Sequence, residues 1–369
     1  MRIVHLANHC QLIGNGIVNM MVDLACSQAD AGHDVVVATS GGRYEPLLAA
    51  HGVRHVVLEQ SRDPWRTPAM VLGFNRLLRD VDPDVVHAHM MTGAIIARFG
   101  TWRRRYALVT TVHNEFQKSA SLMRYGDRVV AVTQAVEKAM IGRGIRADRI
   151  CTVLNGTVGT PRRAQASTAD PLRLSRPSIT TVAGMYERKG IQDLLRAFAS
   201  LRATHPDATL YLVGDGPDRA DMEALAAELG LEGWAHFAGF DTNPVRWLAE
   251  TDVFVLASHK EPGGLVLSEA REAGCAIVAT DVDGNPEMLD RGEAGWLVPA
   301  RAPDALAAAI GSLLGDAALR ADYAARARRN LDKFTVQRVA NDYMAVYATA
   351  LDVFRQTHGR RPRTALRSS

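Results

Sequence analysis

The sequence predicts an α/β protein made of two Rossmann-like, doubly wound domains that face a central cleft. Short runs rich in Val and Ile alternate with longer helical stretches, which is typical of a parallel sheet with helices on both faces. The alternation stops once, in a segment without periodicity, and then starts again. A length of 369 residues suits two domains of about 150 residues each.

The first half of the chain alternates strands and helices from its start. Its strands are predicted as short, buried, mostly apolar runs at 2–8, 34–40, 54–59, 84–89, 107–113, 128–133 and 149–155. Helices are predicted at 16–31, 68–80 and 134–142. Right-handed crossovers between parallel strands then make this half Rossmann-like.

Residues 157–177 break the pattern and are interpreted as an interdomain linker, because they are rich in Pro, Ser, Thr and Arg. The second half repeats the alternation. Its strands are predicted at 178–184, 209–214, 253–258 and 276–280, and its helices at 190–204, 217–230, 265–273, 303–314, 316–332 and 335–356. The predicted domains are therefore 1–165 and 166–335, followed by a last helix and a basic tail in 336–369.

Composition excludes several classes of protein. The four cysteines are scattered without a CxxC pair, so neither a disulfide framework nor a zinc site is predicted, and a reducing compartment fits. The first residues do not read as a signal peptide, and no apolar run approaches the ~18 residues needed to span a bilayer. We therefore expect a cytoplasmic protein, without a nucleic-acid partner.

Charge is distributed unevenly along the chain. Residues 1–170 hold 20 Lys and Arg against 14 Asp and Glu, and the last fifteen residues hold five Arg and no acid. The segment TWRRRYAL (101–108) mixes aromatic and cationic side chains, as at a membrane interface. This pattern indicates contact with an anionic membrane surface or a phosphorylated acceptor; the alternative is an ordinary solvated surface.

The strongest chemical signal is KEPGGLVLSEAREAG (260–274). Gly263 and Gly264 let the backbone approach a ligand closely, and the helix after them offers free N–H groups and a positive dipole end to a diphosphate. Glu261 can accept hydrogen bonds from sugar hydroxyls, and Glu269 from ribose hydroxyls. The alternative is a helix-capping Glu followed by an exposed helix Glu.

A second predicted strand end carries two cations. In AGMYERKGIQDLL (183–195), Arg188 and Lys189 lie between a strand and a helix. Cations are unfavourable at a helix start, because the dipole is positive there, so a function explains them more easily than a solvated pair. They can neutralise a diphosphate and the charge that grows on a leaving nucleotide.

Glycines follow other predicted strands. LIGNGIVNMMVDLA (12–25) places Gly16 at the start of the first helix, but it lacks the third glycine of GxGxxG, because residue 19 is Asn. Gly214, in LVGDGPD (212–218), suits close approach by a nucleotide.

Histidines also lie at predicted strand ends. His113, in TTVHNEF (110–116), is expected to point into the cleft, where an imidazole can hydrogen-bond a reacting sugar; a structural histidine is the alternative. His87 and His89 share one face, but no third ligand is evident, so no metal site is predicted there. The DxD pattern that ends at Asp283 is not expected to bind a metal either.

The segments GNGIVNMMVDLA, DVVHAH, TVHN, VLNG, ERKG, VGDGP, EPGGLVLSEA and GNPEM occur in this order, and with them the chain resembles family 4 of the glycosyltransferases over roughly residues 1–345. The resemblance implies the GT-B architecture, with the donor in the C-terminal domain, the acceptor on the N-terminal one, and a last helix that crosses back to the first domain. It also implies retention of anomeric configuration without a metal or other cofactor, from a UDP- or GDP-sugar.

The resemblance assigns a role to each candidate by position. Glu261 would hold the donor sugar, Glu269 the ribose, and Lys189 with Arg188 the diphosphate. His113 would lie at the reacting sugar. The expected catalytic residues are thus His113, Glu261 and Lys189, and the expected donor-binding residues are Gly16, Arg188, Lys189, Gly214, Gly263, Gly264, Leu265 and Glu269.

Two positions depart from the family pattern. Met185 stands where the family usually has an arginine, and Arg188 is the candidate to replace it. Asn15 and Gly16 stand in place of a double glycine, so Asn15 is expected to add a side-chain contact.

The predicted function is transfer of a sugar to a saccharide or lipid-linked saccharide in cell-envelope polysaccharide or lipopolysaccharide synthesis. Three alternatives stay open: a nucleotide-sugar epimerase of the same fold, an NAD-dependent oxidoreductase, and a non-catalytic protein that binds a nucleotide sugar. The incomplete GxGxxG argues against the oxidoreductase.

Overall fold

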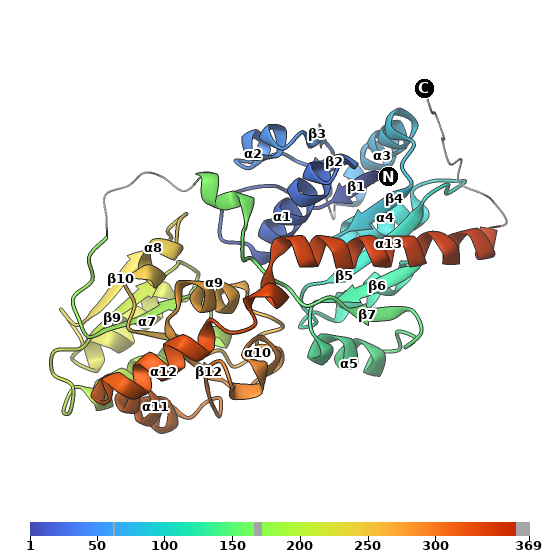
Figure 1. Cartoon of the computed structure of the whole chain (residues 1–369). Coiled ribbons are helices and arrows are strands. Elements are labelled where there is room, and N and C mark those ends of the chain that lie inside the picture. Colours follow the sequence, from blue (N-terminus) through green and yellow to red (C-terminus); the bar gives the residue numbers. More distant parts are fainter. Residues whose placement is uncertain (62, 166–171, 359–369) are drawn as a thin grey trace. The chain divides into compact units, whose positions relative to one another are not determined.

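The computed structural model describes residues 1–61, 63–165 and 172–358 (Figure 1). They form two compact units, each with its own parallel sheet and apolar core. The first unit takes its described residues from 1–155, 159–162 and 336–358, and the second takes them from 156–158 and 163–335. The predicted α/β class with two Rossmann-like sheets is confirmed.

The sheet of the first unit has the strand order β3-β2-β1-β4-β5-β6-β7, and its neighbouring strands are parallel. Its strands are β1 (Arg2–Leu6), β2 (Asp34–Thr39), β3 (Arg54–Val57), β4 (Val85–Ala88), β5 (Ala107–Val112), β6 (Arg128–Ala131) and β7 (Ile150–Thr152). The order reverses between β1 and β4, and ligands of open α/β sheets bind beside such a point.

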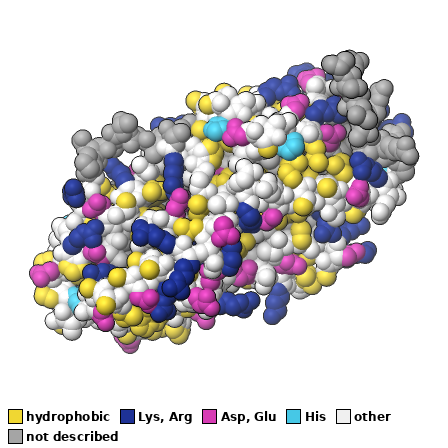
Figure 2. All heavy atoms as spheres, viewed as in Figure 1, with side chains coloured by type: hydrophobic (Ala, Val, Ile, Leu, Met, Phe, Trp, Pro, Cys, Tyr) yellow, Lys and Arg dark blue, Asp and Glu magenta, His cyan; other side chains and the backbone are white. Residues whose placement is uncertain are grey.

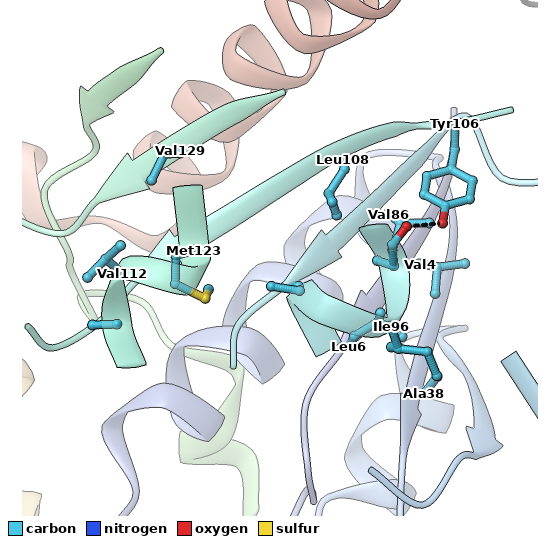
Figure 3. Packing of buried hydrophobic residues seen from close by; sticks show 14 of the residues in the cluster. Val4, Leu6, Ala38, Val86, Ile96, Tyr106, Leu108, Val112, Met123 and Val129 are labelled. Atoms are coloured by element: carbon cyan, nitrogen blue, oxygen red, sulfur yellow. Dashed lines mark hydrogen bonds between the residues drawn. The ribbon is translucent and has the colours of Figure 1, made fainter. Parts of the chain in front are cut away.

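The two faces of this sheet carry different side chains, because successive residues of a strand point to opposite faces. Val4, Leu6 and Val86 are buried on the face covered by α3 (Thr67–Val81) and α4 (Met91–Phe99), where Tyr106 donates a hydrogen bond to the Ala97 carbonyl at 2.6 Å (Figure 3). The opposite face lies against α1 (Gly16–Asp30) and α13 (Val336–His358). The remaining helices are α2 (Glu45–Ala50), α5 (Gln134–Gly142), η1 (Pro64–Arg66) and η2 (Lys118–Tyr125), and η3 (Pro161–Gln165) follows the sheet.

The sheet of the second unit has the order β10-β9-β8-β11-β12-β13, again with parallel neighbours. Its strands are β8 (Ser178–Val182), β9 (Thr209–Val213), β10 (Ala235–Gly239), β11 (Val253–Leu256), β12 (Ala276–Thr280) and β13 (Trp296–Val298). The helices are α6 (Ile191–Leu201), α7 (Arg219–Glu228), α8 (Val245–Ala249), α9 (Leu265–Ala273), α10 (Asn285–Met288), α11 (Pro303–Gly315) and α12 (Ala317–Ala327), with the short turns η4 (Glu187–Lys189), η5 (Asp290–Gly292) and η6 (Leu331–Phe334).

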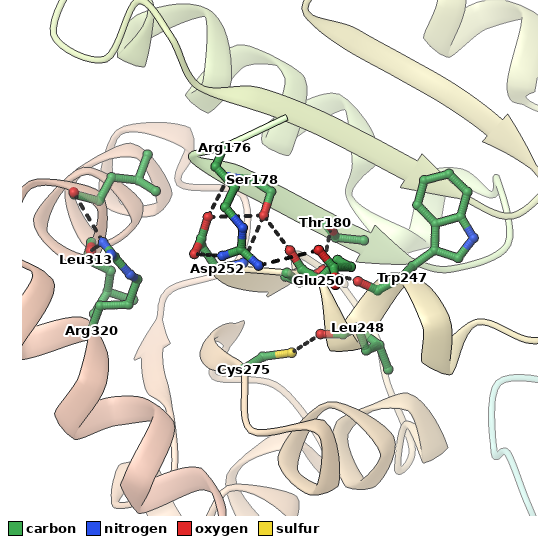
Figure 4. A network of polar contacts seen from close by, with 12 residues as sticks. Arg176, Ser178, Thr180, Trp247, Leu248, Glu250, Asp252, Cys275, Leu313 and Arg320 are labelled. Carbon is green, nitrogen blue, oxygen red and sulfur yellow. Dashed lines mark hydrogen bonds and ion pairs between the residues drawn. The ribbon is translucent and has the colours of Figure 1, made fainter. Parts of the chain in front are cut away.

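A polar network joins the amino ends of β8 and β11, which are neighbours in this sheet (Figure 4). Asp252 accepts hydrogen bonds from the Ser178 backbone N–H at 2.9 Å and from its hydroxyl at 3.2 Å, and it pairs with Arg176. Thr251 Oγ1 donates to Thr180 Oγ1 at 2.7 Å. The amino ends of these two neighbouring strands are therefore held together by side chains as well as by the sheet.

Some predicted elements differ from the structure. The run 54–59 is predicted as a buried strand, but β3 is an edge strand on which Arg54 and Val57 are exposed. The helix predicted at 316–332 ends at Ala327 and is followed by η6. The sequence does not predict α2, α4, α8, β10 or β13, which are short and carry weak periodicity.

The predicted linker, 157–177, is tied down in its first part. The Thr157 hydroxyl is buried and hydrogen-bonded to that of Ser268 at 2.6 Å within the second unit. Thr160 and Arg162 bind the buried carboxylate of Asp23 at 2.7 and 2.8 Å within the first. Residues 166–171 of this segment, and the arginines of the tail after residue 358, lie outside the described residues.

Candidate functional site

The second unit brings together the loops that follow β8 and β11. After β8 the chain forms η4 and turns at Gly190, whose φ of 65° is left-handed. A Cβ at Gly190 would lie 1.9 Å from the Ala257 carbonyl oxygen, so only glycine lets the two loops approach this closely. Lys189 is thereby held against the loop that follows β11.

Lys189 and Glu261 form an ion pair in that loop. Lys189 Nζ donates to Glu261 Oε2, and the Ser258 hydroxyl donates to the same oxygen at 3.1 Å. The two side chains are 14% and 7% exposed. The Glu261 backbone N–H donates to Asp283 Oδ2 at 2.8 Å. An ammonium and a carboxylate are therefore fixed beside the carboxyl ends of β8 and β11, where they can bind an anion and hydroxyl groups.

The helix α9 begins directly after Gly264, and no described side chain caps its first turn. Its first N–H groups, beginning with Leu265, are the kind of donors that bind phosphate at helix N-termini. Gly263 precedes them in the same loop. Glu269 lies one turn further along α9 and is buried. The sequence motif 260–274 is thus brought together with the cationic η4.

Met185 does not face this site. Its side chain is fully buried in the apolar core of the second unit, and its backbone N–H donates to the Asp215 carbonyl at 3.0 Å. The Arg188 guanidinium lies 5.4 Å from the centre of the Tyr186 ring, beside Lys189 in η4. Replacement of the missing arginine by Arg188 stays a prediction.

Gly214 lies at the end of β9, the neighbour of β8. Its φ is 139°, and a Cβ there would lie 2.0 Å from the Ala183 carbonyl oxygen. Glycine is therefore required for the approach of these two chain segments, independently of any ligand.

The residues that support this loop pair were not predicted from the sequence to do so. His259 Nε2 bonds Asp193 Oδ2 at 2.6 Å, and the His259 backbone N–H donates to the Arg188 carbonyl at 2.8 Å. Asp283, from the DxD pattern, orients the Glu261 backbone. Each lies within a few residues of a motif identified from sequence, but pairing across 66 positions, as between Asp193 and His259, leaves no sequence signal.

The first unit holds the other predicted site residues. Asn15 caps α1 by accepting a hydrogen bond from the Ile17 backbone N–H at 3.0 Å, so its side-chain oxygen serves the helix itself. Gly16 follows as the exposed first residue of α1.

His113 follows β5 and lines a cavity of about 160 Å³ within the first unit. The cavity lies beside the reversal of strand order, at the carboxyl ends of β4 and β5. Its other lining residues include Asn8, Ile17, Met90, Thr92 and Gln117. His113 is thus placed where a sheet of this type binds ligands.

A buried polar cluster stands behind His113 on the face of the sheet covered by α1 and α13. His87 bonds the Tyr347 hydroxyl through Nδ1 and Thr111 Oγ1 through Nε2, both at 2.7 Å. The sequence identifies His87 and His89 but misses His5, which the register of β1 and β4 pairs directly with His87. The signal that could have identified His5 is its position on the strand next to His87 in the predicted sheet.

Burial keeps this cluster neutral. It lowers the pKa of His5 to about 4 and that of His113 to about 3, and it holds the pKa of His87 and of His89 well below the ordinary value near 6.5. Ligand atoms of His5, His87 and His89 lie within 4.8 Å of one another, as in a metal site. However, each ring nitrogen of these three residues already bonds a side chain, so hydrogen bonding accounts for the cluster.

Family models match both halves of the chain. The model described as Glycosyltransferase Family 4 matches residues 14–158, and the one described as Glycosyl transferases group 1 matches residues 165–330.

Two curated relatives match along most of their length. N-acetyl-alpha-D-glucosaminyl L-malate synthase of Bacillus anthracis is 26% identical, over 92% of this chain and 94% of the relative. Phosphatidyl-myo-inositol mannosyltransferase of Mycolicibacterium smegmatis is 29% identical, over 91% of each chain.

Among solved structures, Anabaena HepE in complex with UDP and glucose has a TM-score of 0.81. It is 21% identical, and the match covers 95% of this chain and 100% of that one. At this identity the likeness shows a shared fold.

Proposed function

Because this chain belongs to the family 4 glycosyltransferases, we propose that it transfers a sugar from a UDP- or GDP-sugar with retention of anomeric configuration and without a metal ion. The observation that carries the proposal is the Lys189–Glu261 pair beside the uncapped start of α9. Together they offer a cation, a hydroxyl acceptor and free N–H groups, which are the groups needed to bind a sugar diphosphate.

In the proposed reaction the bond between the anomeric carbon and the diphosphate breaks while the acceptor hydroxyl attacks the same face of the sugar and gives its proton to the departing diphosphate oxygen. Lys189, Arg188 and the first N–H groups of α9 stabilise the negative charge that develops on the diphosphate. The Glu261 carboxylate accepts hydrogen bonds from hydroxyls of the donor sugar, and the Glu269 carboxylate accepts them from hydroxyls of the ribose. These protein cations take the role that a divalent ion has in metal-dependent transferases.

A thermal-shift screen against UDP, GDP, ADP, their sugar conjugates and NAD, with and without EDTA, tests the donor class. Ligand at 100 times its Kd stabilises the native state by about 2.7 kcal/mol, which raises the melting temperature. We expect one nucleoside diphosphate and its sugar conjugate to raise it equally with and without EDTA. A shift with NAD alone contradicts the proposal, and a shift abolished by EDTA contradicts metal independence.

The selected donor then tests the reaction. The anomeric proton coupling of the product, measured by NMR, should match that of the donor sugar. Inversion contradicts the retaining mechanism. Isomerisation of the donor without any acceptor indicates the epimerase instead, and binding without turnover on any acceptor indicates the non-catalytic protein.

We further propose that the acceptor is a lipid-linked saccharide met at an anionic membrane surface. The support is a pair of tryptophans on the first unit, Trp65 and Trp102, which are 92% and 97% exposed. Asn75 on α3 donates to the Gly100 carbonyl at 2.6 Å, which ties the loop of Trp102 to the helix that follows Trp65. Of the two relatives, one is named for a phosphatidyl-inositol acceptor and the other for malate, so the acceptor class must be tested directly.

Not all of TWRRRYAL serves this surface. Tyr106 is buried, and Arg104 is nearly buried in an ion pair with Asp127, which leaves Trp102, Arg103 and Arg105 facing outward. Basic and acidic side chains are interspersed on the face shown in Figure 2. None of the helices in the described part of the chain has the length and apolarity needed to cross a bilayer.

Vesicle flotation tests the membrane contact. Binding to vesicles with anionic lipid should appear at low salt and weaken as salt is added. The double variant Trp65→Ala/Trp102→Ala should bind less, while Phe240→Ala, which removes an exposed aromatic from the second unit, should bind like the parent protein. Absence of binding at low salt contradicts the membrane proposal and favours a freely diffusing acceptor.

A further inference from the structure

A continuous chain of hydrogen bonds runs through the buried face of the first unit and ends at His113. Gln28 Oε1, on α1, lies 2.8 Å from His5 Nε2. His5 Nδ1 lies 3.0 Å from His89 Nε2, and His89 Nδ1 lies 3.2 Å from His113 Nε2. The chain thus crosses the ends of β1, β4 and β5, which are consecutive in the sheet.

All the hydrogen bonds in such a chain must run from donor to acceptor in the same direction. A neutral imidazole has one N–H and one lone pair, so a ring that donates through one nitrogen must accept through the other. His5, His89 and His113 are all neutral, because burial lowers the pKa of each. The direction fixed at one end of the chain is therefore transmitted to the other.

Gln28 fixes that direction. Its carbonyl oxygen can only accept, so His5 donates to it through Nε2 and accepts from His89 through Nδ1. His89 then accepts from His113 Nε2–H. Gln28 Nε2 is buried and has no hydrogen-bond partner in the described part of the chain. The structure thus turns the carbonyl oxygen of Gln28, and not its amide nitrogen, toward His5.

The cavity beside His113 offers hydrogen-bond acceptors. His113 Nδ1, left with a lone pair, makes no hydrogen bond with a described residue. Asn8 Oδ1, from the same cavity lining, is buried and also lacks a partner in the described part of the chain. Two acceptors suit a ligand that donates hydrogen bonds, such as a polyhydroxyl, and repel the acceptor-only oxygens of an ionised phosphate.

We propose that Gln28, His5 and His89 are positioning residues that hold His113 in the tautomer protonated at Nε2, so that Nδ1 accepts a hydrogen bond from a sugar hydroxyl in this cavity. The identity of the ligand as a sugar rests on the proposed transferase function. The tautomer itself does not depend on it.

Long-range ¹H–¹⁵N correlation spectra of the ligand-free protein labelled with ¹⁵N-histidine test the tautomer directly. The His113 signals are identified by their loss in His113→Gln. We expect Nε2 to carry the proton and Nδ1 to be bare at pH 7.5. The opposite tautomer, or a doubly protonated ring, overturns the proposal.

Variants of Gln28 test where the direction is set. Gln28→Glu keeps an acceptor toward His5 and should preserve the His113 tautomer, whereas Gln28→Met should give a mixture of both tautomers. An unchanged His113 in Gln28→Met overturns the positioning role of Gln28. Should that variant fail to fold, His89→Asn interrupts the chain one link nearer to His113, and the same mixture is expected.

Kinetics with the nucleotide sugar chosen by the thermal-shift screen give a functional readout. Because only the fraction of His113 in the productive tautomer makes its catalytic contact, Gln28→Met should lower kcat ~2-fold for an equal mixture of tautomers with little change in donor KM, and Gln28→Glu should keep the parent value. Equal kcat in both variants overturns the proposal. If no nucleotide sugar binds, the transferase proposal fails while the spectra still decide the tautomer.

Discussion

Lys189 and Glu261 hold each other in place before any substrate arrives. Both are mostly out of water: Lys189 pairs with Glu261, and Glu261 also accepts a hydrogen bond from the Ser258 hydroxyl. A buried ion pair of this kind adds little net stability, but removing one member leaves the other charge unpaired. Ligand binding therefore explains the presence of this pair better than a contribution to stability does.

Lys189→Met should lower turnover with the selected donor ~10²- to 10³-fold, because it removes one electrostatic contact to the leaving diphosphate. It should also destabilise the second unit by roughly 3–5 kcal/mol, because Glu261 is left buried and unpaired. Adding Glu261→Gln should recover most of the stability and none of the turnover. Steady-state kinetics and urea denaturation measure both quantities.

Lys333→Met is the matched control, because it removes a half-exposed lysine whose ion pair with Asp290 is worth about 0–1 kcal/mol. Its turnover should equal that of the parent protein. Parent-like turnover in Lys189→Met would remove Lys189 from the mechanism.

At the scale of elements, the turn at Gly190 sets the distance between η4 and the loop after β11. Gly190→Ala combines a left-handed φ with a Cβ placed 1.9 Å from the Ala257 carbonyl oxygen. Gly230→Ala has nearly the same φ, 67°, but no atom within 4 Å of the added carbon. The pair of variants therefore separates backbone strain from steric exclusion.

Gly230→Ala should cost about 1–2 kcal/mol, the penalty for a left-handed alanine. Gly190→Ala should cost clearly more than this and should also weaken donor binding, since the loop must move and carry Lys189 with it. Urea midpoints and thermal shifts with the selected nucleotide measure the two effects. Equal stability of the two variants contradicts a close approach at Gly190.

The element order could be predicted well where strands are buried and helices are long, as for β5, α1 and α13. Prediction fails for β10 and α8, because an edge strand with alternate residues exposed and a helix of five residues leave little periodicity. The motifs around Lys189 and Glu261 could be found because each is contiguous in sequence.

Contacts between distant residues could not be predicted. Arg271 is fully buried, and its guanidinium donates to the Met288 carbonyl at 2.6 Å, to the Ala327 carbonyl at 2.9 Å and to Asp290 at 2.8 Å. Nothing in the local sequence distinguishes it from an exposed helix arginine. The same holds for Gln28 and His5, whose significance comes from a sheet register and a helix packed across it.

For the whole molecule, the neutral histidines make stability depend on pH. Their pKa values in the native state lie below about 6.5, the value of an unfolded histidine, so below that pH the unfolded chain binds protons that the native protein does not. The free energy of unfolding is therefore highest above about pH 7. It falls as the pH is lowered from 6.5 toward 4, by up to about 1.4 kcal/mol per pH unit for each histidine.

Hydrogen-exchange mass spectrometry of peptides from β1, β4 and β5, recorded from pH 7.5 to 5 and corrected for the intrinsic exchange rate, measures this loss. His113→Gln should reduce the slope by about one proton. A flat profile in the parent protein contradicts neutral burial of the cluster.

The two units also differ in when they can be completed during synthesis. The second is built from nearly contiguous chain, whereas the first takes its strands from before residue 155 and α13 from residues 336–358. Tyr343 and Tyr347 on α13 supply the hydroxyls that hold Thr111 and His87. On the ribosome the first seven strands are made early, yet their histidine-lined face stays open until the last helix emerges. The usual order, in which the N-terminal domain finishes folding first, is reversed here.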